Sequence, residues 1–130
     1  MSPRANPRLA GIAKAIYDLR RARRRIVDDA GNLFFEPGWD MMLDLYVASQ
    51  TQTLRTVTNA CVAADVPQTT GLRYIGTLIE HGLVIRHKHC KDKRMLGVEL
   101  TAAGIRRMEE ILVEFERKLG RAGFALKSGP

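Results

Sequence analysis

The sequence is poor in the features that mark several classes of protein. It has two cysteines, Cys61 and Cys90, which are too few for the disulfide framework of a small secreted protein. It has no run of about 18 apolar residues that would cross a bilayer. The N-terminal MSPRANPRLAG has no apolar core of the kind found in signal peptides. These absences predict a cytoplasmic protein with free thiols and no membrane partner.

Motifs for catalysis are missing as well. The sequence contains no phosphate-binding loop, no nucleophile motif and no catalytic triad. Asp40 and Asp44 are spaced one helical turn apart, but no histidine or metal-spaced partner accompanies them. We therefore interpret them as part of a solvated helix face. These observations predict that the protein is not an enzyme and has no cofactor.

The composition is that of one folded domain with unevenly distributed positive charge. The 130 residues are 45% hydrophobic and 27% charged, and we expect a single domain over residues 1–130. The formal net charge is +7, to which residues 1–30 contribute +5 and residues 86–94 contribute +4. Such clusters favour a polyanionic partner. The arginines at 20–25 also have a second interpretation, a solvated helix face.

Apolar residues recur at helical spacing near both ends of the chain. We predict a first helix over 8–28, a second from Pro37 to about residue 50, and a last helix over 101–119 that Thr101 caps. The first and last helices have heptad-like seams, and a 130-residue monomer has little core left to cover both. We therefore predict a homodimer whose interface contains Leu9, Ile12, Ile16, Leu19, Met108, Leu112, Phe115 and Leu119.

The Thr-rich residues 51–57 predict a short strand or connector, and two shorter helices are predicted after it. Thr58 is expected to cap a helix over 59–64. After a turn, Pro67 is expected to start a helix over 67–81, because proline is tolerated at the first helical position. Gly82 ends this helix, since glycine adopts the left-handed conformation of a helix C-terminus. The spacing is typical of a helix-turn-helix.

The residues that follow predict a β-ribbon. Residues 83–88 and 95–100 have the composition of strands, and the HCKDKR between them forms a charged hairpin tip. The order of elements predicts a mainly α fold with a small β-wing. We expect a winged helix-turn-helix domain, with the helix-turn-helix at 58–81 and the wing at 83–100, flanked by N- and C-terminal dimerisation helices.

The two faces of the helix over 67–81 differ in chemistry. One face is expected to pack against Cys61 and Val62, and consists of Gly71, Tyr74, Ile75 and Leu78. The other offers amide, hydroxyl, methyl and guanidinium groups, from Gln68, Thr69, Leu72, Arg73, Gly76 and Thr77. Such groups match base edges in the major groove of DNA, where arginine suits guanine, glutamine suits adenine and a methyl group suits thymine. The helix therefore predicts double-stranded DNA as a partner.

A longer pattern runs without a gap from residue 66 to 86 and continues through the ribbon. Its residues are Val66, Thr70, Arg73, Leu78, Gly82-Leu83-Val84 and Arg86, then Asp92-Lys93-Arg94 and Val98-Glu99-Leu100-Thr101-Ala102-Ala103-Gly104. In this pattern the sequence resembles the MarR-type winged-helix regulators, loosely over 37–119. The resemblance implies a dimeric repressor that reads a pseudo-palindromic operator, with Arg94 in the minor groove and Asp92 orienting the wing. The family usually has a longer C-terminal helical pair.

The predicted DNA contacts combine this resemblance with the distribution of charge. Phosphate contacts are expected to set much of the affinity, so binding should weaken steeply with salt. The predicted contact residues are Gln68, Thr69, Thr70, Leu72, Arg73, Thr77, Arg86, Lys88, Lys91, Lys93 and Arg94.

Histidines and cysteines leave further interpretations open. His87, His89 and Cys90, together with His81, are zinc-ligand types, but three ligands on a hairpin tip without a distant fourth are few. We predict no metal there and favour phosphate contacts. Cys61 is expected to be a small core residue. The alternative is redox sensing, at Cys61 or at Cys90, whose neighbouring lysines would lower the thiol pKa.

Some features of the sequence also fit functions other than DNA regulation. Trp39, Tyr46 and the pair Phe34-Phe35 either line a pocket for a small aromatic effector or form hydrophobic core. A winged helix also serves as a protein-interaction or architectural module without operator specificity, against which the clustered basic charge argues. RNA binding would favour aromatic residues on the basic face, and the exposed face of the helix over 67–81 has none.

Overall fold

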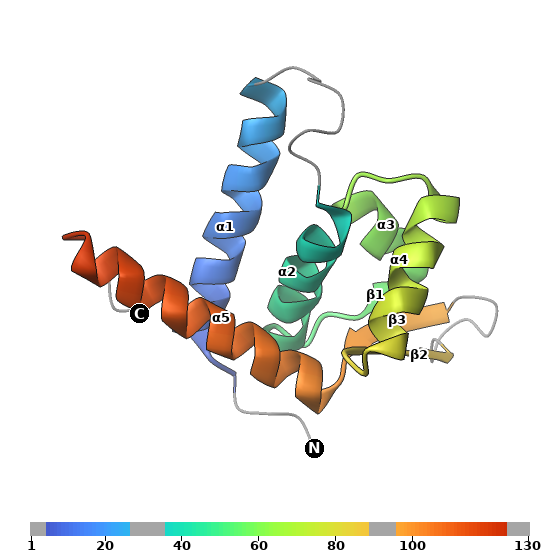
Figure 1. Ribbon diagram of the computed structural model, residues 1–130. Helices are drawn as coiled ribbons and strands as arrows, with labels where there is room; N and C mark the ends of the chain where they lie inside the picture. Colours follow the sequence, from blue (N-terminus) through green and yellow to red (C-terminus); the bar gives the residue numbers. More distant parts are fainter. Residues whose placement is uncertain (1–4, 27–35, 89–95, 125–130) are drawn as a thin grey trace.

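The computed structural model describes residues 5–26, 36–88 and 96–124, and within them the chain forms five helices and three strands (Figure 1). In chain order these are α1 (Pro7–Ile26), α2 (Pro37–Gln50), β1 (Arg55–Thr56), α3 (Val57–Ala63), α4 (Gln68–Glu80), β2 (Val84–Lys88), β3 (Leu96–Leu100) and α5 (Ala102–Arg121). This order confirms the predicted fold class, mainly helical with a small sheet. None of the helices in the described ranges is both long and apolar enough to span a bilayer.

The predicted two-stranded ribbon is part of a three-stranded antiparallel sheet in the order β1-β3-β2. Strands β2 and β3 pair over their full length, from Val84 opposite Leu100 to Lys88 opposite Leu96. The two-residue strand β1 adds to the other edge of β3, where Arg55 lies opposite Val98. This strand therefore joins the start of α3 to the middle of β3.

The helix ends follow from side-chain caps, with small corrections to the sequence-based bounds. Thr56, rather than Thr58, caps α3: its hydroxyl accepts from the Asn59 amide, and the Asn59 side chain accepts from the Thr56 amide, both over 3.1 Å. Thr101 caps α5 as predicted, since its hydroxyl accepts from the Gly104 amide over 3.0 Å. Pro67 is the N-cap of α4 rather than its first residue. Gly82 follows α4 with a φ of +71°.

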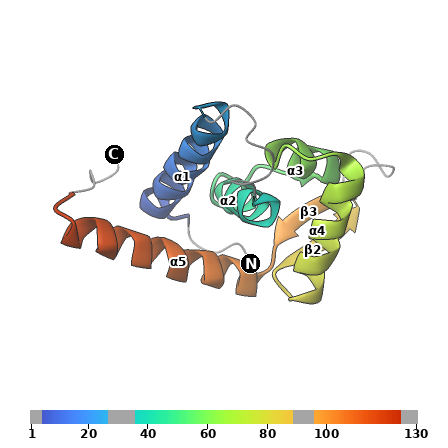
Figure 2. The ribbon, with the colours of Figure 1, turned by 45° about the horizontal axis from the view of Figure 1, so that its top comes forward.

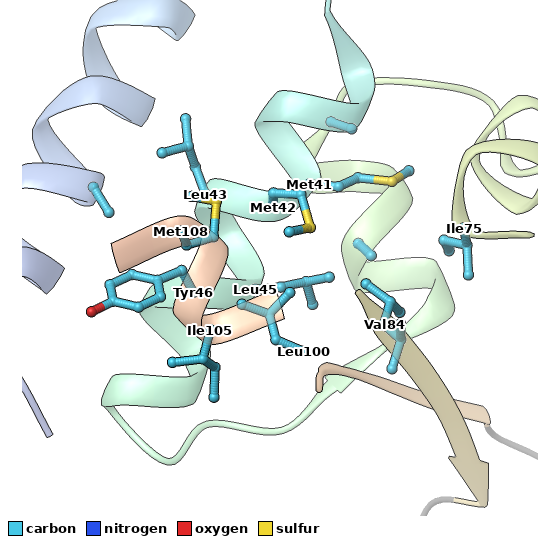
Figure 3. Packing of buried hydrophobic residues seen from close by; sticks show 14 of the residues in the cluster. Met41, Met42, Leu43, Leu45, Tyr46, Ile75, Val84, Leu100, Ile105 and Met108 are labelled. Atoms are coloured by element: carbon cyan, nitrogen blue, oxygen red, sulfur yellow. The ribbon is translucent and has the colours of Figure 1, made fainter. Parts of the chain in front are cut away.

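Helix α2 lies at the centre of the protein, between α1 and the pair α3–α4 in both views (Figures 1 and 2). Its residues Met41, Leu43, Leu45 and Tyr46 are fully buried and pack with residues from all the other helices (Figure 3). A helix that is apolar on most sides requires such a position, because any exposed side would leave apolar surface in water.

The central position of α2 corrects the argument for the dimer interface. Leu9, Ile12, Met108 and Leu112 are buried in the protein's own core, so no second chain is needed to cover them. Ile16 is partly buried against the same core, and Leu119 is half-buried. Of the predicted interface, Leu19 and Phe115 remain well exposed, at 66% and 40%. The seams of α1 and α5 therefore pack within one chain, against α2 and against each other.

Candidate nucleic-acid interface

Helix α4 is held by a close contact with α3. Gly71 and Ile75 are buried, and a Cβ added to Gly71 would lie 2.1 Å from the sulfur of Cys61. A larger side chain at residue 71 would therefore force the two helices apart. The predicted packing partner Cys61 is confirmed, whereas Val62 is 68% exposed and does not pack in this way.

The opposite face of α4 is open. The side chains of Gln68, Thr69, Arg73 and Thr77 are exposed, and Thr70 is half-buried. Leu72 is also half-buried and packs against the core, so its methyl groups are less available than the sequence predicted. The Arg73 guanidinium lies 6.0 Å from the centre of the Tyr74 ring. Within the described parts of the chain, Arg73 has no carboxylate partner.

The ribbon begins directly after α4. Arg86 is exposed on β2. His87 is half-buried and lies over Gly97 of β3, where an added Cβ would come within 2.4 Å of the imidazole. Its Nε2 is 4.0 Å from the Glu99 carboxylate. The side chain of Lys88 and the predicted contacts Lys91, Asp92, Lys93 and Arg94 lie outside the described residues.

The described residues contain no group of three metal-ligating side chains. Two of the four considered for zinc, His89 and Cys90, lie outside these residues. His81, the C-cap of α4, has its Nδ1 2.9 Å from the Thr77 carbonyl oxygen.

Part of the basic cluster on α1 is engaged inside the protein. Arg20 forms an ion pair with Asp40, and the two side chains are only 10% and 9% exposed. Its guanidinium also lies 3.9 Å from Glu36. Arg21 is 3.9 Å from the carboxylate of Asp65 in the turn before α4. Arg20 is therefore not available to the polyanionic partner that the charge of residues 1–30 favoured.

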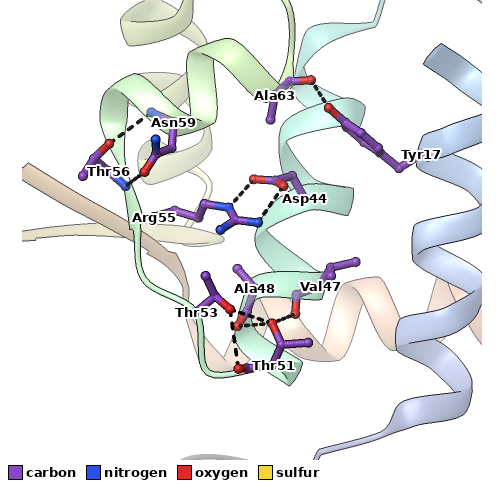
Figure 4. A network of polar contacts seen from close by, with 10 residues as sticks. All are labelled: Tyr17, Asp44, Val47, Ala48, Thr51, Thr53, Arg55, Thr56, Asn59 and Ala63. Atoms are coloured by element: carbon purple, nitrogen blue, oxygen red, sulfur yellow. Dashed lines mark hydrogen bonds and ion pairs between the residues drawn. The ribbon is translucent and has the colours of Figure 1, made fainter.

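Asp40 and Asp44 do not form the solvated face that their spacing predicted. Asp40 is buried beside Arg20. Asp44 accepts two hydrogen bonds from the Arg55 guanidinium, over 3.0 and 3.2 Å (Figure 4). Such paired bonds hold an arginine in one orientation. The two aspartates thus connect α2 to α1 and to β1.

Cys61 and the aromatic residues of α2 belong to the core. Cys61 is buried, and burial raises the pKa of its thiol, which confirms the structural interpretation of this residue. Tyr46 is fully buried, and its hydroxyl donates to Glu109 of α5 over 2.8 Å. Burial raises the pKa of Tyr46, and the hydrogen bond to Glu109 raises it further by a smaller amount. Trp39 packs against the core, and Phe34 and Phe35 lie outside the described residues.

Comparison with solved structures identifies the fold. The chain is similar to S. aureus MepR in a MepR–DNA complex, with 20% identity and a TM-score of 0.57 over 81% of this chain and 80% of that one. It is similar to the transcriptional regulator PA4135, with 20% identity and a TM-score of 0.56 over 82% and 75% of the two chains. The fold is that of the MarR-type winged-helix regulators.

The winged-helix match to Lactococcus lactis ZitR is shorter, with 16% identity and a TM-score of 0.54. It covers 67% of this chain and 56% of the ZitR chain. No protein-family model and no curated protein sequence matches the chain. In winged-helix terms, α3 and α4 are the helix-turn-helix pair and β2–β3 is the wing.

A cleft of about 670 Å³ lies between the winged-helix sheet and α5. Its walls combine apolar residues such as Leu45 and Ile105 with charged ones such as Arg106 and Glu99. Neither Trp39 nor Tyr46, the aromatics considered for an effector pocket, lines it. The sequence did not reveal this cleft because its walls come from α2, all three strands and α5.

Proposed function

We propose that this chain is a cytoplasmic, sequence-specific double-stranded DNA-binding regulator that acts as a dimeric repressor. The observation that carries the proposal is the geometry of α4. Its buried side is fixed by Gly71 against Cys61, while its open side presents Gln68, Thr69 and Arg73. These side chains suit base edges in a major groove. MepR, whose fold the chain shares, is known in complex with DNA.

Contacts to phosphate complete the proposed interface. Arg86 is exposed on the wing strand, and Lys88, Lys91 and Lys93 continue the positive segment in the sequence. We assign Arg94 to the adjacent minor groove and Asp92 to the orientation of the wing. Each neutralised phosphate releases a condensed counterion, so affinity should fall steeply as salt rises.

Selection of duplexes from a random DNA pool, at two salt concentrations, tests this function. We expect recovery of an inverted repeat with half-sites about ten base pairs apart, which corresponds to one turn of DNA between two α4 helices. Equal, salt-sensitive binding to every duplex would contradict operator recognition. That result would instead favour the architectural or protein-interaction module.

The proposed dimer uses the apolar surface that the core leaves uncovered. On α5, Ile111 and Phe115 are 47% and 40% exposed, one turn apart on the same side of the helix. Leu19 of α1 is 66% exposed. Val113, which is 38% exposed on a different side of α5, provides a matched control. We expect Phe115→Asp to yield monomers in sedimentation and Val113→Asp to remain dimeric. Dimers of unchanged strength in both variants would exclude this face.

Binding of a small aromatic effector is a second candidate function, favoured by the cleft beside α5. MepR is known bound to ethidium bromide, which makes this dye a suitable probe. We expect ethidium to raise the thermal unfolding temperature, because a ligand that binds only the folded state stabilises it. Ala102→Trp, at an exposed position of the cleft wall, should abolish the shift. An equal shift in both proteins, or none in either, would contradict this site.

A further inference from the structure

The turn between α3 and α4 contains a carbonyl group that its own helix cannot satisfy. In a continuing helix, the carbonyl of Ala63 would accept from the amide four residues later. Residue 67 is a proline and has no N–H. The hydroxyl of Tyr17 on α1 supplies the missing donor, over 2.6 Å to the Ala63 oxygen (Figure 4). A tyrosine hydroxyl is protonated at neutral pH in any case, and burial raises the pKa of Tyr17 further.

A second contact joins the same face of α1 to the same turn. Arg21 lies one helical turn after Tyr17, and its Nη1 is 3.9 Å from the Asp65 carboxylate. Asp65 has a φ of +57° and marks the bend of the turn. The Arg21 Nη1 is buried and makes no hydrogen bond with the described residues. The ion pair is thus wider than a charge-assisted hydrogen bond of about 2.7–2.9 Å.

The turn is bonded firmly to the helices on both of its sides. The amides of Asp65 and Val66 donate to carbonyls of α3 over 3.0 and 3.1 Å, and the Gly71 amide donates to Pro67 over 2.9 Å. Gly71 also lies in close contact with Cys61 of α3. Because these hydrogen bonds and this contact hold the turn to α3 and α4, we expect a shift of the turn relative to α1 to move α4 as well.

We propose that Tyr17 and Arg21 are positioning residues for DNA recognition, which fix the α3–α4 turn on α1 and thereby set the orientation of α4. This inference rests on the proposed function, in which α4 reads DNA. Leu19 lies between these two residues in sequence but projects from a different side of α1 and is exposed. The same helix therefore connects the proposed dimer surface with the reading helix.

A pair of tyrosine variants tests the inference. Tyr17→Phe removes only the hydroxyl that bonds Ala63. Tyr46→Phe makes the same chemical change at the α2–α5 contact, where the hydroxyl bonds Glu109 instead. We expect Tyr17→Phe to speed amide hydrogen exchange at Asp65 and Val66 about fivefold, the effect of one hydrogen bond. Tyr46→Phe should leave these two amides at the wild-type rate.

The second readout is the ratio of affinities for a selected duplex and for a scrambled one. Tyr17→Phe and Arg21→Gln should each lower this ratio about fivefold, and Tyr46→Phe should leave it unchanged. Equal exchange rates at Asp65 and Val66 in the two tyrosine variants would overturn the proposal that Tyr17 fixes the α3–α4 turn. An equal loss of the ratio in both would also overturn it, since general loosening would then suffice. Absence of specific binding in the wild-type protein would contradict the proposed function. The exchange rates at Asp65 and Val66 would still show whether Tyr17 fixes the α3–α4 turn.

Discussion

The arginines of α1 and the arginine of α4 are the same residue type in two very different environments. The Arg20 side chain is only 10% exposed, is paired with Asp40 and lies close to Glu36. Arg73 is exposed, and the described residues offer it no carboxylate. A guanidinium that is already paired with carboxylates cannot also neutralise a phosphate, whereas an open one retains its donors. The comparison teaches that the charge on α1 is partly structural, whereas the guanidinium without a described carboxylate partner lies on α4, the helix that we propose reads DNA.

The largest predicted effect comes from removing the ion pair between Arg20 and Asp40. Arg20→Met leaves Asp40 charged and buried without a partner, which should lower the free energy of unfolding by about 3–5 kcal/mol. Urea denaturation measures this loss. Lys14→Met is the matched control, because Lys14 forms an exposed ion pair with Asp18 on the same helix. Its cost should be below about 1 kcal/mol.

A further variant sharpens the result. In Arg20→Met combined with Asp40→Leu, both charges are replaced by apolar groups, so most of the lost stability should return. If Arg20→Met were as stable as Lys14→Met, the buried ion pair would not contribute as the structure indicates.

The next effect concerns the reading half. Arg73→Ala should cost about 1–3 kcal/mol of binding free energy on the selected duplex and relax the preference at one base pair of each half-site. Its unfolding free energy should stay near the wild-type value, since the side chain is exposed. Titrations against duplexes that differ at single positions measure this effect. Equal losses on every sequence would show that Arg73 contacts only phosphate.

The smallest effect separates the wing from α4. Arg86→Ala should weaken binding to all duplexes alike and reduce the slope of log affinity against log salt by about one. Titrations at several salt concentrations give this slope. A loss confined to one base pair would move Arg86 from phosphate contact to base reading.

Arg94→Ala should instead weaken binding most on sites with narrow A·T minor grooves.

Local signals predicted much of the fold. Thr101 begins α5 and Gly82 follows the end of α4, as the sequence indicated. Both positions could be predicted because a helix cap depends on residues only three or four positions apart. The strand bounds of the ribbon were predicted within one residue. The two faces of α4 also followed from helical periodicity. The DNA contacts of α4 stay predictions, because its exposed groups favour DNA as a partner but do not show DNA bound.

Long-range packing accounts for what the sequence did not reveal. Asp40 and Asp44 looked solvated because their partners, Arg20 and Arg55, lie 20 and 11 residues away and meet them only in the folded chain. The seam of α1 looked unpaired because the covering role of α2 depends on tertiary arrangement. The pairing of β1 with β3 was missed for the same reason. The sequence predicts a short strand or connector over 51–57, and β1 lies within it, but its pairing partner is set only in the folded chain.

Arginine modification read by mass spectrometry, with and without the selected duplex, tests the central claim most directly. The account predicts that Arg73 reacts readily in the free protein and is protected by DNA. Arg20 should react slowly in both states, because its guanidinium is buried against carboxylates. Arg73 that stays equally reactive on DNA, or Arg20 that becomes protected by it, would contradict the assignment of DNA reading to α4.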